Sequence, residues 1–304
     1  MTELTVTSMQ PLEAIKCMVL DSVSSAKTKA LYGQALAEFL DWYAGTQQPG
    51  LCKATVNSWR AQLEQRGLSP SSVNVRMAAI RKLAMEAADN GMLDSGIAAG
   101  ILRVKGAKRL GISIGNWLSA TQAQDLLNAP DATTVKGMRD RAILAIMLGS
   151  GLRRSEVATL TVSHLQQREG RWVIVDLIGK HGRVRSVPIA SWIKAVIDRW
   201  LSGANITNGP VFRAVNKGGN VAGEGMTAQA VYNLFRAYAS EVGVRIAPHD
   251  CRRSFAHLSR KAGASIEQVQ LSLGHASVQT TERYLGTRQD LIDSPSDRLP
   301  LRLA

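Results

Sequence analysis

Residues 248–284, PHDCRRSFAHLSRKAGASIEQVQLSLGHASVQTTERY, hold the most informative pattern in the chain. Pro248 suits the first position of a helix, and His249 and Arg252 are three residues apart, so they share that helix's first turn. Free N–H groups and the positive end of the helix dipole favour an anion there. The pattern predicts a helix that begins at an anion site, although the same residues also fit a capped helix with a basic face.

A histidine and a tyrosine follow later in the same stretch. His275 comes directly after Gly274, a residue type that ends helices, and Tyr284 lies nine residues further on. A metal site made by His249 and His275 lacks the closely spaced carboxylates or thiols that would complete it, so we expect no metal. Taken alone, Tyr284 is no more than a core or surface tyrosine.

An arginine and a glutamate share a second motif, which reads GLRRSE from Gly151 to Glu156. An apolar helix ends at its glycine and a new turn begins with arginine. Arg153 and Glu156 are three residues apart, so they share a helix face on which the carboxylate can orient the guanidinium. On its own the motif is also typical of a solvated helix start.

A hairpin carries the next candidate, Lys180. Residues 171–178 and 183–189 have the character of strands, and a glycine-rich turn joins them. A lysine on a tight turn is usually only exposed. A hairpin can, however, push one ammonium group into a groove, where it can protonate a leaving oxygen.

The length of 304 residues predicts two domains, and a stretch rich in Gly, Lys and Arg, residues 104–115, marks the boundary between them. Residues 1–105 predict an all-helical bundle, and residues 106–116 predict a basic linker suited to a phosphate backbone. The rest mixes helices with the hairpin, so the predicted fold class is mainly α with a small antiparallel β-sheet. The helices are expected at 27–44, 55–66, 69–90, from 94, from 119, and at 136–149, 191–201, 227–242, 248–262, 265–273 and up to 284.

The charge of the chain points to a polyanionic partner. Lys and Arg number 37 against 24 Asp and Glu, which gives a formal charge of +13 and a pI of about 10.0. Residues 1–105 hold 11 basic and 9 acidic residues, whereas the remainder holds 26 and 15. So basic a chain attracts polyanions, nucleic acid first, although some basic proteins bind acidic proteins or membrane surfaces instead.

Cysteine usage and hydropathy bear on the compartment. Cys17, Cys52 and Cys251 form no CxxC pair and are odd in number, which favours a reducing cytoplasm. The N-terminus lacks the basic start of a secretory signal, and the longest apolar run, residues 142–148, is too short to span a bilayer. We expect a cytoplasmic protein with no membrane partner.

Together the motifs resemble the catalytic domain of the tyrosine recombinases, the integrase family of site-specific DNA recombinases that includes phage integrases and Xer-like enzymes. The order G-L-R-x-x-E, G-K in a hairpin, H-x-x-R, L-G-H and Y is the family's pattern. The resemblance covers residues 117–285 and implies an α/β catalytic domain. Residues 1–105 resemble the family's helical, SAM-like core-binding domain, and the apolar tail 286–304 its protomer-docking segment.

The resemblance implies a role for each motif residue. Arg153, Arg252 and His275 would hold the nonbridging oxygens of the scissile phosphate. Tyr284 would be the nucleophile, with His249 as its general base and Lys180 as the general acid for the departing 5′ oxygen. Glu156 would orient Arg153, and Arg154 is the alternative to Arg153 if the register is shifted by one.

The resemblance also implies double-stranded DNA as the partner. The expected DNA-binding residues are Lys105, Lys108, Arg109, Arg154, Arg183, Arg185 and Arg253. A phosphotyrosine bond keeps the energy of the phosphodiester, so no cofactor is expected, and the arginines would replace a metal ion. Exchange between two duplexes requires four active sites, which implies a tetramer on paired, inverted half-sites.

Two other functions remain open at this point. A type IB topoisomerase-like enzyme uses similar residues to nick and reseal one strand, and it would relax supercoiled DNA of any sequence. A site-specific DNA-binding protein with a silent active site is the second alternative. A gel that detects covalent protein–DNA adducts separates that alternative from both enzymes.

Overall fold

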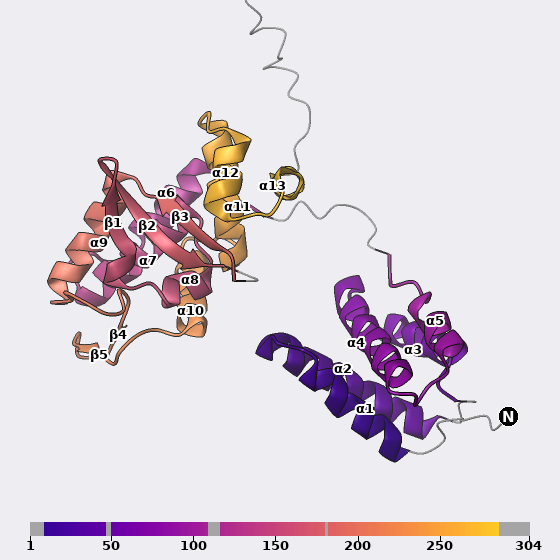
Figure 1. Cartoon of the computed structure of the whole chain (residues 1–304). Coiled ribbons are helices and arrows are strands. Elements are labelled where there is room, and N and C mark those ends of the chain that lie inside the picture. Colours follow the sequence, from indigo (N-terminus) through magenta and orange to yellow (C-terminus); the bar gives the residue numbers. More distant parts are fainter. Residues whose placement is uncertain (1–8, 47–49, 109–115, 180–181, 286–304) are drawn as a thin grey trace, which may run out of the picture. The chain divides into compact units, whose positions relative to one another are not determined.

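The computed structural model describes residues 9–46, 50–108, 116–179 and 182–285, and it divides the chain into two compact units, Met1–Ile112 and Ser113–Ala304 (Figure 1). Two of the expected site residues, Lys180 and Arg109, lie outside the described residues, as does the tail 286–304. The expected roles of the linker, the tail and the first part stay predictions.

The first unit is a helical bundle. Its described helices are α1 (Met9–Asp21), α2 (Ala26–Gly45), α3 (Lys53–Gln65), α4 (Pro70–Asp89) and α5 (Ser95–Leu102). Ser25, Ser69 and Asp94 accept hydrogen bonds from N–H groups of the helices that follow them, which fixes where α2, α4 and α5 begin. The edge of Phe39 packs against Trp59, with 5.8 Å between ring centroids, in the middle of the core.

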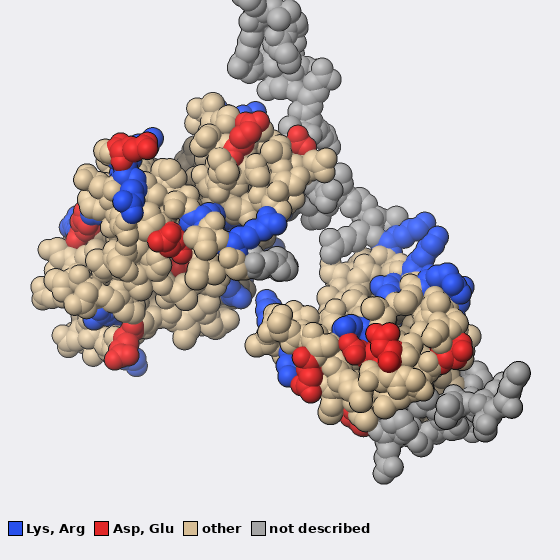
Figure 2. Space-filling view, in the orientation of Figure 1, with Lys and Arg blue, Asp and Glu red and all other residues tan. Residues whose placement is uncertain are grey.

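Two hydrogen bonds hold the chain that leaves this bundle against its helices. Arg60 donates to the carbonyl of Lys105 at 2.9 Å, and Asn74 donates to the carbonyl of Ala107 at 3.1 Å. Lys105 and Lys108 are exposed beside these contacts. Basic side chains gather over α5 on the face of the first unit shown in Figure 2.

The second unit places helices around a small sheet. Its described helices are α6 (Ala120–Asn128), α7 (Val135–Ser150), α8 (Arg154–Ala158), α9 (Ser191–Gly203), α10 (Ala228–Glu241), α11 (Pro248–Lys261), α12 (Ile266–Leu273) and α13 (Val278–Leu285). The strands are β1 (Leu165–Arg168), β2 (Arg171–Ile178) and β3 (Val184–Pro188), with a separate pair β4 (Ala214–Val215) and β5 (Val221–Ala222).

The fold class expected from sequence is confirmed. The three-stranded sheet is antiparallel in the order β1-β2-β3, and helices account for most of the described chain. Ser119 and Gln122 form a capping box at the start of α6, where a helix is expected from residue 119. The buried stripe of α2 runs through Ala35, Leu36, Phe39 and Leu40, which leaves Leu31 of the same helix 43% exposed.

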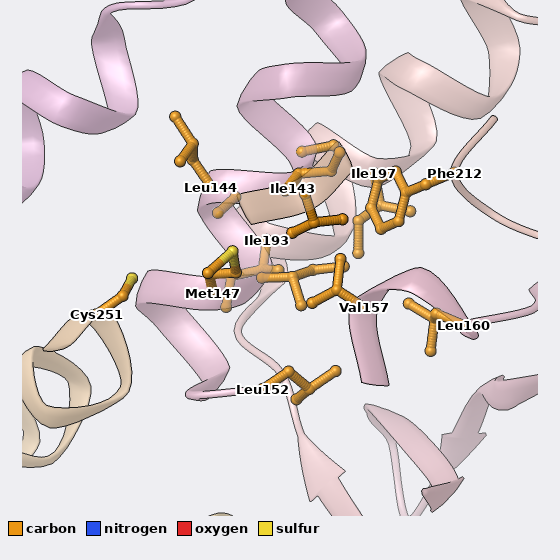
Figure 3. Packing of buried hydrophobic residues seen from close by; sticks show 14 of the residues in the cluster. Ile143, Leu144, Met147, Leu152, Val157, Leu160, Ile193, Ile197, Phe212 and Cys251 are labelled. Carbon is orange, nitrogen blue, oxygen red and sulfur yellow. The ribbon is translucent and has the colours of Figure 1, made fainter. Parts of the chain in front are cut away.

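Helix α7 forms the centre of the second core. Ile143 and Met147 of α7 pack with Ile193 of α9 and with Val157 of α8, all fully buried (Figure 3). Cys251 of α11 is buried in the same cluster and behaves as an apolar residue. Burial of each such side chain stabilises the fold by roughly 1.5–3 kcal/mol. Helices α8, α9 and α11, which contribute side chains to this cluster, are therefore attached to a rigid support.

Within the described ranges, no helix is both long and apolar enough to cross a membrane.

Candidate active site

The first arginine of the site is positioned by a glycine. Helix α7 ends at Gly151, which adopts a left-handed conformation with φ +62°. A Cβ on this residue would come within 2.6 Å of the Phe255 ring, so only glycine fits. The chain reverses there, and Arg153 becomes the residue that precedes α8.

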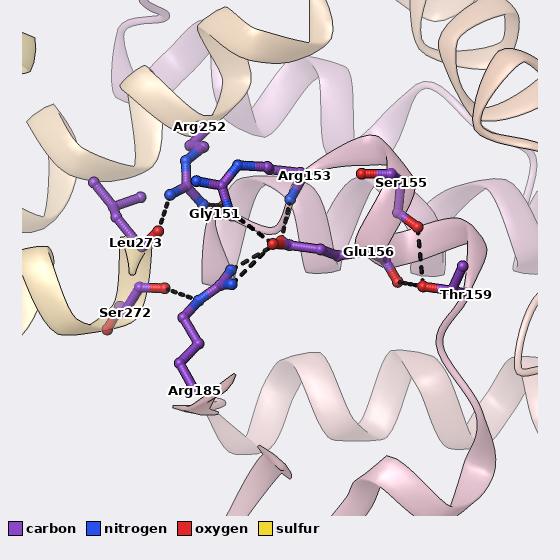
Figure 4. A network of polar contacts seen from close by, with 9 residues as sticks. All are labelled: Gly151, Arg153, Ser155, Glu156, Thr159, Arg185, Arg252, Ser272 and Leu273. Carbon is purple, nitrogen blue, oxygen red and sulfur yellow. Dashed lines mark hydrogen bonds and ion pairs between the residues drawn. The ribbon is translucent and has the colours of Figure 1, made fainter. Parts of the chain in front are cut away.

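Glu156 holds Arg153 in place, as the sequence suggested. Its carboxylate accepts the Arg153 N–H at 2.7 Å and the Arg153 Nη1 at 2.8 Å (Figure 4). Burial would raise the pKa of this carboxyl, but hydrogen bonds from Arg185 and Arg153 outweigh burial and lower it to about 2. Glu156 is therefore ionised at any pH at which the protein is handled.

Arg252 lies deeper, on the first turn of α11. It is 1% exposed, and its Nη1 donates to the Gly151 carbonyl at 2.6 Å while its Nη2 donates to the Leu273 carbonyl. Burial and the neighbouring Arg153 lower the pKa of Arg252 to about 9, which still leaves it charged near neutral pH. Its buried Nε has no hydrogen-bond partner within the described ranges.

His275 is oriented by a residue that sequence reasoning missed. Its Nδ1 lies 2.9 Å from the hydroxyl oxygen of Thr281, a side chain with no exposed surface on α13. Burial, with Arg252 and Arg153, lowers the pKa of His275 to about 4, so the ring is neutral at pH 7. The sequence could have indicated a role for Thr281, because it lies three residues, about one helical turn, before Tyr284.

Tyr284 stands between the two histidines. Its ring centroid is 5.6 Å from that of His249 and 5.3 Å from that of His275, edge to face in both cases. The Arg253 guanidinium lies 4.8 Å from the centre of the tyrosine ring. The Tyr284 hydroxyl donates to the backbone carbonyl of His249 at 3.1 Å.

The protonation states at this tyrosine suit a proton transfer. Burial raises the pKa of Tyr284, and the nearby Arg252 and Arg253 do not overcome it, so the phenol keeps its proton near pH 7. Burial, Arg252 and Arg253 lower the pKa of His249, so its ring is neutral there and can accept a proton. The structure thus brings together five of the six expected catalytic residues: Arg153, His249, Arg252, His275 and Tyr284.

The expected DNA-binding residues fall into different environments. Arg154 lies 5.1 Å from the centre of the Tyr232 ring, and Arg183 is exposed. Arg185 is 9% exposed and forms an ion pair with Glu156, so its guanidinium already has protein partners. None of these contacts tests DNA binding, which stays a prediction for each residue.

Within the described ranges, no group of three or more His, Cys, Asp or Glu side chains could hold a metal ion. A hollow of about 180 Å³ opens beside the site instead. It is lined by basic and aliphatic residues, namely Arg153, Gly179, Arg183, Val184, Arg185, Leu271, Gly274 and His275. Its lining suits an anion.

Replacing Thr281 by valine tests the orientation of His275. A net hydrogen bond contributes about 0.5–1.5 kcal/mol, so if the site cleaves DNA as the sequence resemblance implies, Thr281→Val should slow cleavage by up to about 10-fold. DNA affinity should not change. The neighbouring Thr280 is exposed, which makes Thr280→Val the matched control. Equal single-turnover rates for the Thr281→Val variant and the parent protein would show that this contact is unimportant.

Comparison with known sequences identifies relatives over most of the chain. The phage integrase family model matches residues 116–290. Tyrosine recombinase XerD of Lacticaseibacillus casei is 30% identical over 270 residues, which span 84% of this chain and 86% of the relative. Tyrosine recombinase XerD of Vibrio cholerae is 28% identical over 268 residues, which span 84% of each chain.

Solved structures show the same fold. A lambda integrase dimer bound to a COC′ core site matches with a TM-score of 0.69 and 14% identity, over 94% of this chain and 99% of that one. XerH site-specific recombinase bound to its difH substrate matches with a TM-score of 0.67 and 18% identity, over 94% and 82%. The family model covers more than half of the chain, and the L. casei relative is 30% identical over 84% of it, so the chain belongs to the phage integrase family of tyrosine recombinases.

Proposed function

We propose that this site-specific recombinase cleaves and rejoins DNA through Tyr284, one strand at a time. The observation that carries the proposal is the position of the Tyr284 ring between the neutral rings of His249 and His275, with the Arg253 guanidinium 4.8 Å from its centre. The relatives are recombinases, so neither a topoisomerase-like enzyme nor a silent DNA-binding protein is favoured.

Cleavage would be a transesterification at phosphorus. The Tyr284 oxygen forms a bond to the scissile phosphorus while the bond from phosphorus to the 5′ oxygen breaks. The phenolic proton passes to the neutral ring of His249, and the 5′ oxygen takes a proton from Lys180, whose role rests on the resemblance alone. The hydrogen bond from Tyr284 to the His249 carbonyl must break first, because the attacking oxygen has to face the phosphate.

Charge on the phosphate would be held by two arginines. Arg252 is buried with its Nε unpaired among the described residues, and Arg153 has one Nη on Glu156, so both keep donors for nonbridging oxygens. His275 is neutral and donates one ring N–H once Thr281 has fixed its tautomer. Preorganised donors of this kind stabilise a phosphorane-like transition state without reorganisation.

The reaction would conserve energy and run in either direction. The phosphotyrosyl bond replaces one phosphodiester, so the 5′ hydroxyl of a second strand can attack it and release Tyr284. No nucleotide is consumed in that exchange. The arginines supply the positive charge that a metal ion supplies in other phosphoryl-transfer sites, so metal independence is part of the proposal.

Recombination of two duplexes would need assembly on DNA. The lambda integrase and XerH structures that share this fold were solved bound to a COC′ core site and to difH. We extend DNA binding to both units of this chain, acting on inverted half-sites as a tetramer at the nucleoid. The tail 286–304 would join neighbouring protomers through Leu291, Ile292, Leu299, Leu301 and Leu303.

A covalent-capture experiment tests this function. The full chain is mixed with random-sequence duplexes that carry nicks, in excess EDTA and without nucleotide, and protein-linked DNA is sequenced. We expect adducts at a 3′ phosphate, with a free 5′ hydroxyl, on one sequence with inverted symmetry. Strict dependence on Mg²⁺ or linkage to a 5′ phosphate would contradict the proposal, and adducts without sequence preference would favour the topoisomerase-like enzyme.

A further inference from the structure

Arg185 of β3 occupies all three of its guanidinium nitrogens inside the protein. Its Nη1 and Nη2 each lie 2.8 Å from a different oxygen of Glu156, and its Nε donates to the Ser272 carbonyl at 2.9 Å (Figure 4). The two parallel bonds to one carboxylate match the fork geometry of a guanidinium, which an ammonium group does not have.

Through Glu156, Arg185 acts on Arg153. The buried carboxylate is 4% exposed and is shared between the two guanidinium groups. Arg185 occupies one side of it, so Arg153 keeps only one Nη in contact with the carboxylate. Without Arg185 the carboxylate would be left to Arg153 alone, and Arg153 would be drawn away from a phosphate.

Through Ser272, Arg185 also acts on the turn that presents His275. Carbonyls in the last turn of a helix lack partners within the helix. At the end of α12, Arg185 satisfies Ser272 and Arg252 satisfies Leu273. The stem of Arg185 also packs on the next residue, because a Cβ on Gly274 would come within 2.7 Å of its Cδ.

We infer that Arg185 is a positioning residue that aligns Arg153 and His275 on the scissile phosphate. The inference rests on the proposed function, in which those two residues bind that phosphate. It assigns to Arg185 a role inside the protein in place of direct contact with DNA. One side chain of β3 then sets the distance between two phosphate-binding groups that come from separate parts of the sequence.

Arg185→Lys separates alignment from charge. Lysine keeps the positive charge but has one nitrogen, which cannot bind both carboxylate oxygens and the Ser272 carbonyl at once. A misplacement of catalytic groups by about 1 Å costs roughly 10²-fold in rate, and we expect a loss of this size in single-turnover cleavage at saturating protein. DNA affinity should equal that of the parent. Arg171→Lys, an exposed exchange on β2, is the matched control and should change neither quantity.

A neutral phosphate distinguishes positioning from general damage to the structure. A methyl group in place of one nonbridging oxygen removes the charge that the guanidinium groups stabilise. On this methylphosphonate duplex the deficit of Arg185→Lys should shrink by about 10-fold or more. A variant that is only partly unfolded would be slow on both substrates to the same degree, and that result would overturn the inference.

A second variant covers the case in which Arg185→Lys does not fold. Glu156→Gln combined with Arg185→Met removes both buried charges, which proteins tolerate better than loss of one partner. It should show the same slow cleavage, parental DNA affinity and methylphosphonate rescue. A parent protein without adducts overturns the proposed function and the inference together. A parent that cleaves, beside variants that cleave equally fast or only bind DNA less well, overturns the inference alone.

Discussion

Tyr284→Phe is expected to bind DNA as tightly as the parent protein and to form no covalent adduct. The substitution removes one hydroxyl group and keeps the ring that packs against His249 and His275. Loss of a nucleophile typically lowers the rate of a covalent step by about 10⁴-fold or more. The measurement is the amount of protein-linked strand on the nicked duplex selected by covalent capture, with DNA affinity determined in parallel.

Tyr43→Phe is the matched control for this loss. Tyr43 packs against Phe39 in the first unit, so the same atom is removed far from the site in sequence. That variant should form adducts at the parental rate. Adducts that persist in Tyr284→Phe would show that another residue attacks the phosphate, and the assignment of Tyr284 would then be wrong.

Lys180→Ala is expected to slow cleavage by about 10²–10⁴-fold on ordinary DNA, because a positioned proton donor contributes that much. The loss should disappear on a duplex in which sulfur replaces the bridging 5′ oxygen at the scissile position. A thiolate leaves without a proton, so the general acid is no longer needed. Rates on the two substrates, each measured in a single turnover, give the comparison.

Arg153→Ala provides the contrast for Lys180. Its guanidinium would stabilise charge on nonbridging oxygens, which a bridging sulfur does not relieve, so this variant should stay slow on both duplexes. A Lys180→Ala protein that is equally slow on both would show that Lys180 only binds DNA. The exposed Arg183 would then be examined as the acid, since Arg185 is held by Glu156.

Local signals in the sequence predicted most of the second unit. Strand β2 begins and ends at the residues expected, and Thr227 and Ser265 cap α10 and α12 where the spacing placed those helices. Caps and apolar periods depend on neighbours within one or two turns, so a sequence displays them directly. Strand β1 was not predicted, because Leu165–Arg168 is short and polar. It is held in the extended conformation by its pairing with β2.

The sequence predicted which residues make up the site better than it predicted how those residues contact one another. The motif residues could be named because each carries distinctive chemistry at a fixed spacing. The sequence places Arg185 among the expected DNA-binding residues but gives no sign of its ion pair with Glu156, which lies 29 residues earlier in the chain. The bond between His275 and Thr281 and that between Tyr284 and the His249 carbonyl likewise depend on tertiary packing, which no local pattern encodes.

Helix α13, which carries Tyr284, has only eight residues, from Val278 to Leu285. A helix shorter than about 12 residues is unstable alone in water, so α13 owes its order to docking through the buried side chains of Thr281 and Leu285. Tyr284 therefore lies in the site only while α13 is docked, and the docking of α13 has its own equilibrium constant. The observed cleavage rate equals the intrinsic rate multiplied by the docked fraction, and a partner that binds only the docked helix raises that fraction without touching the chemistry.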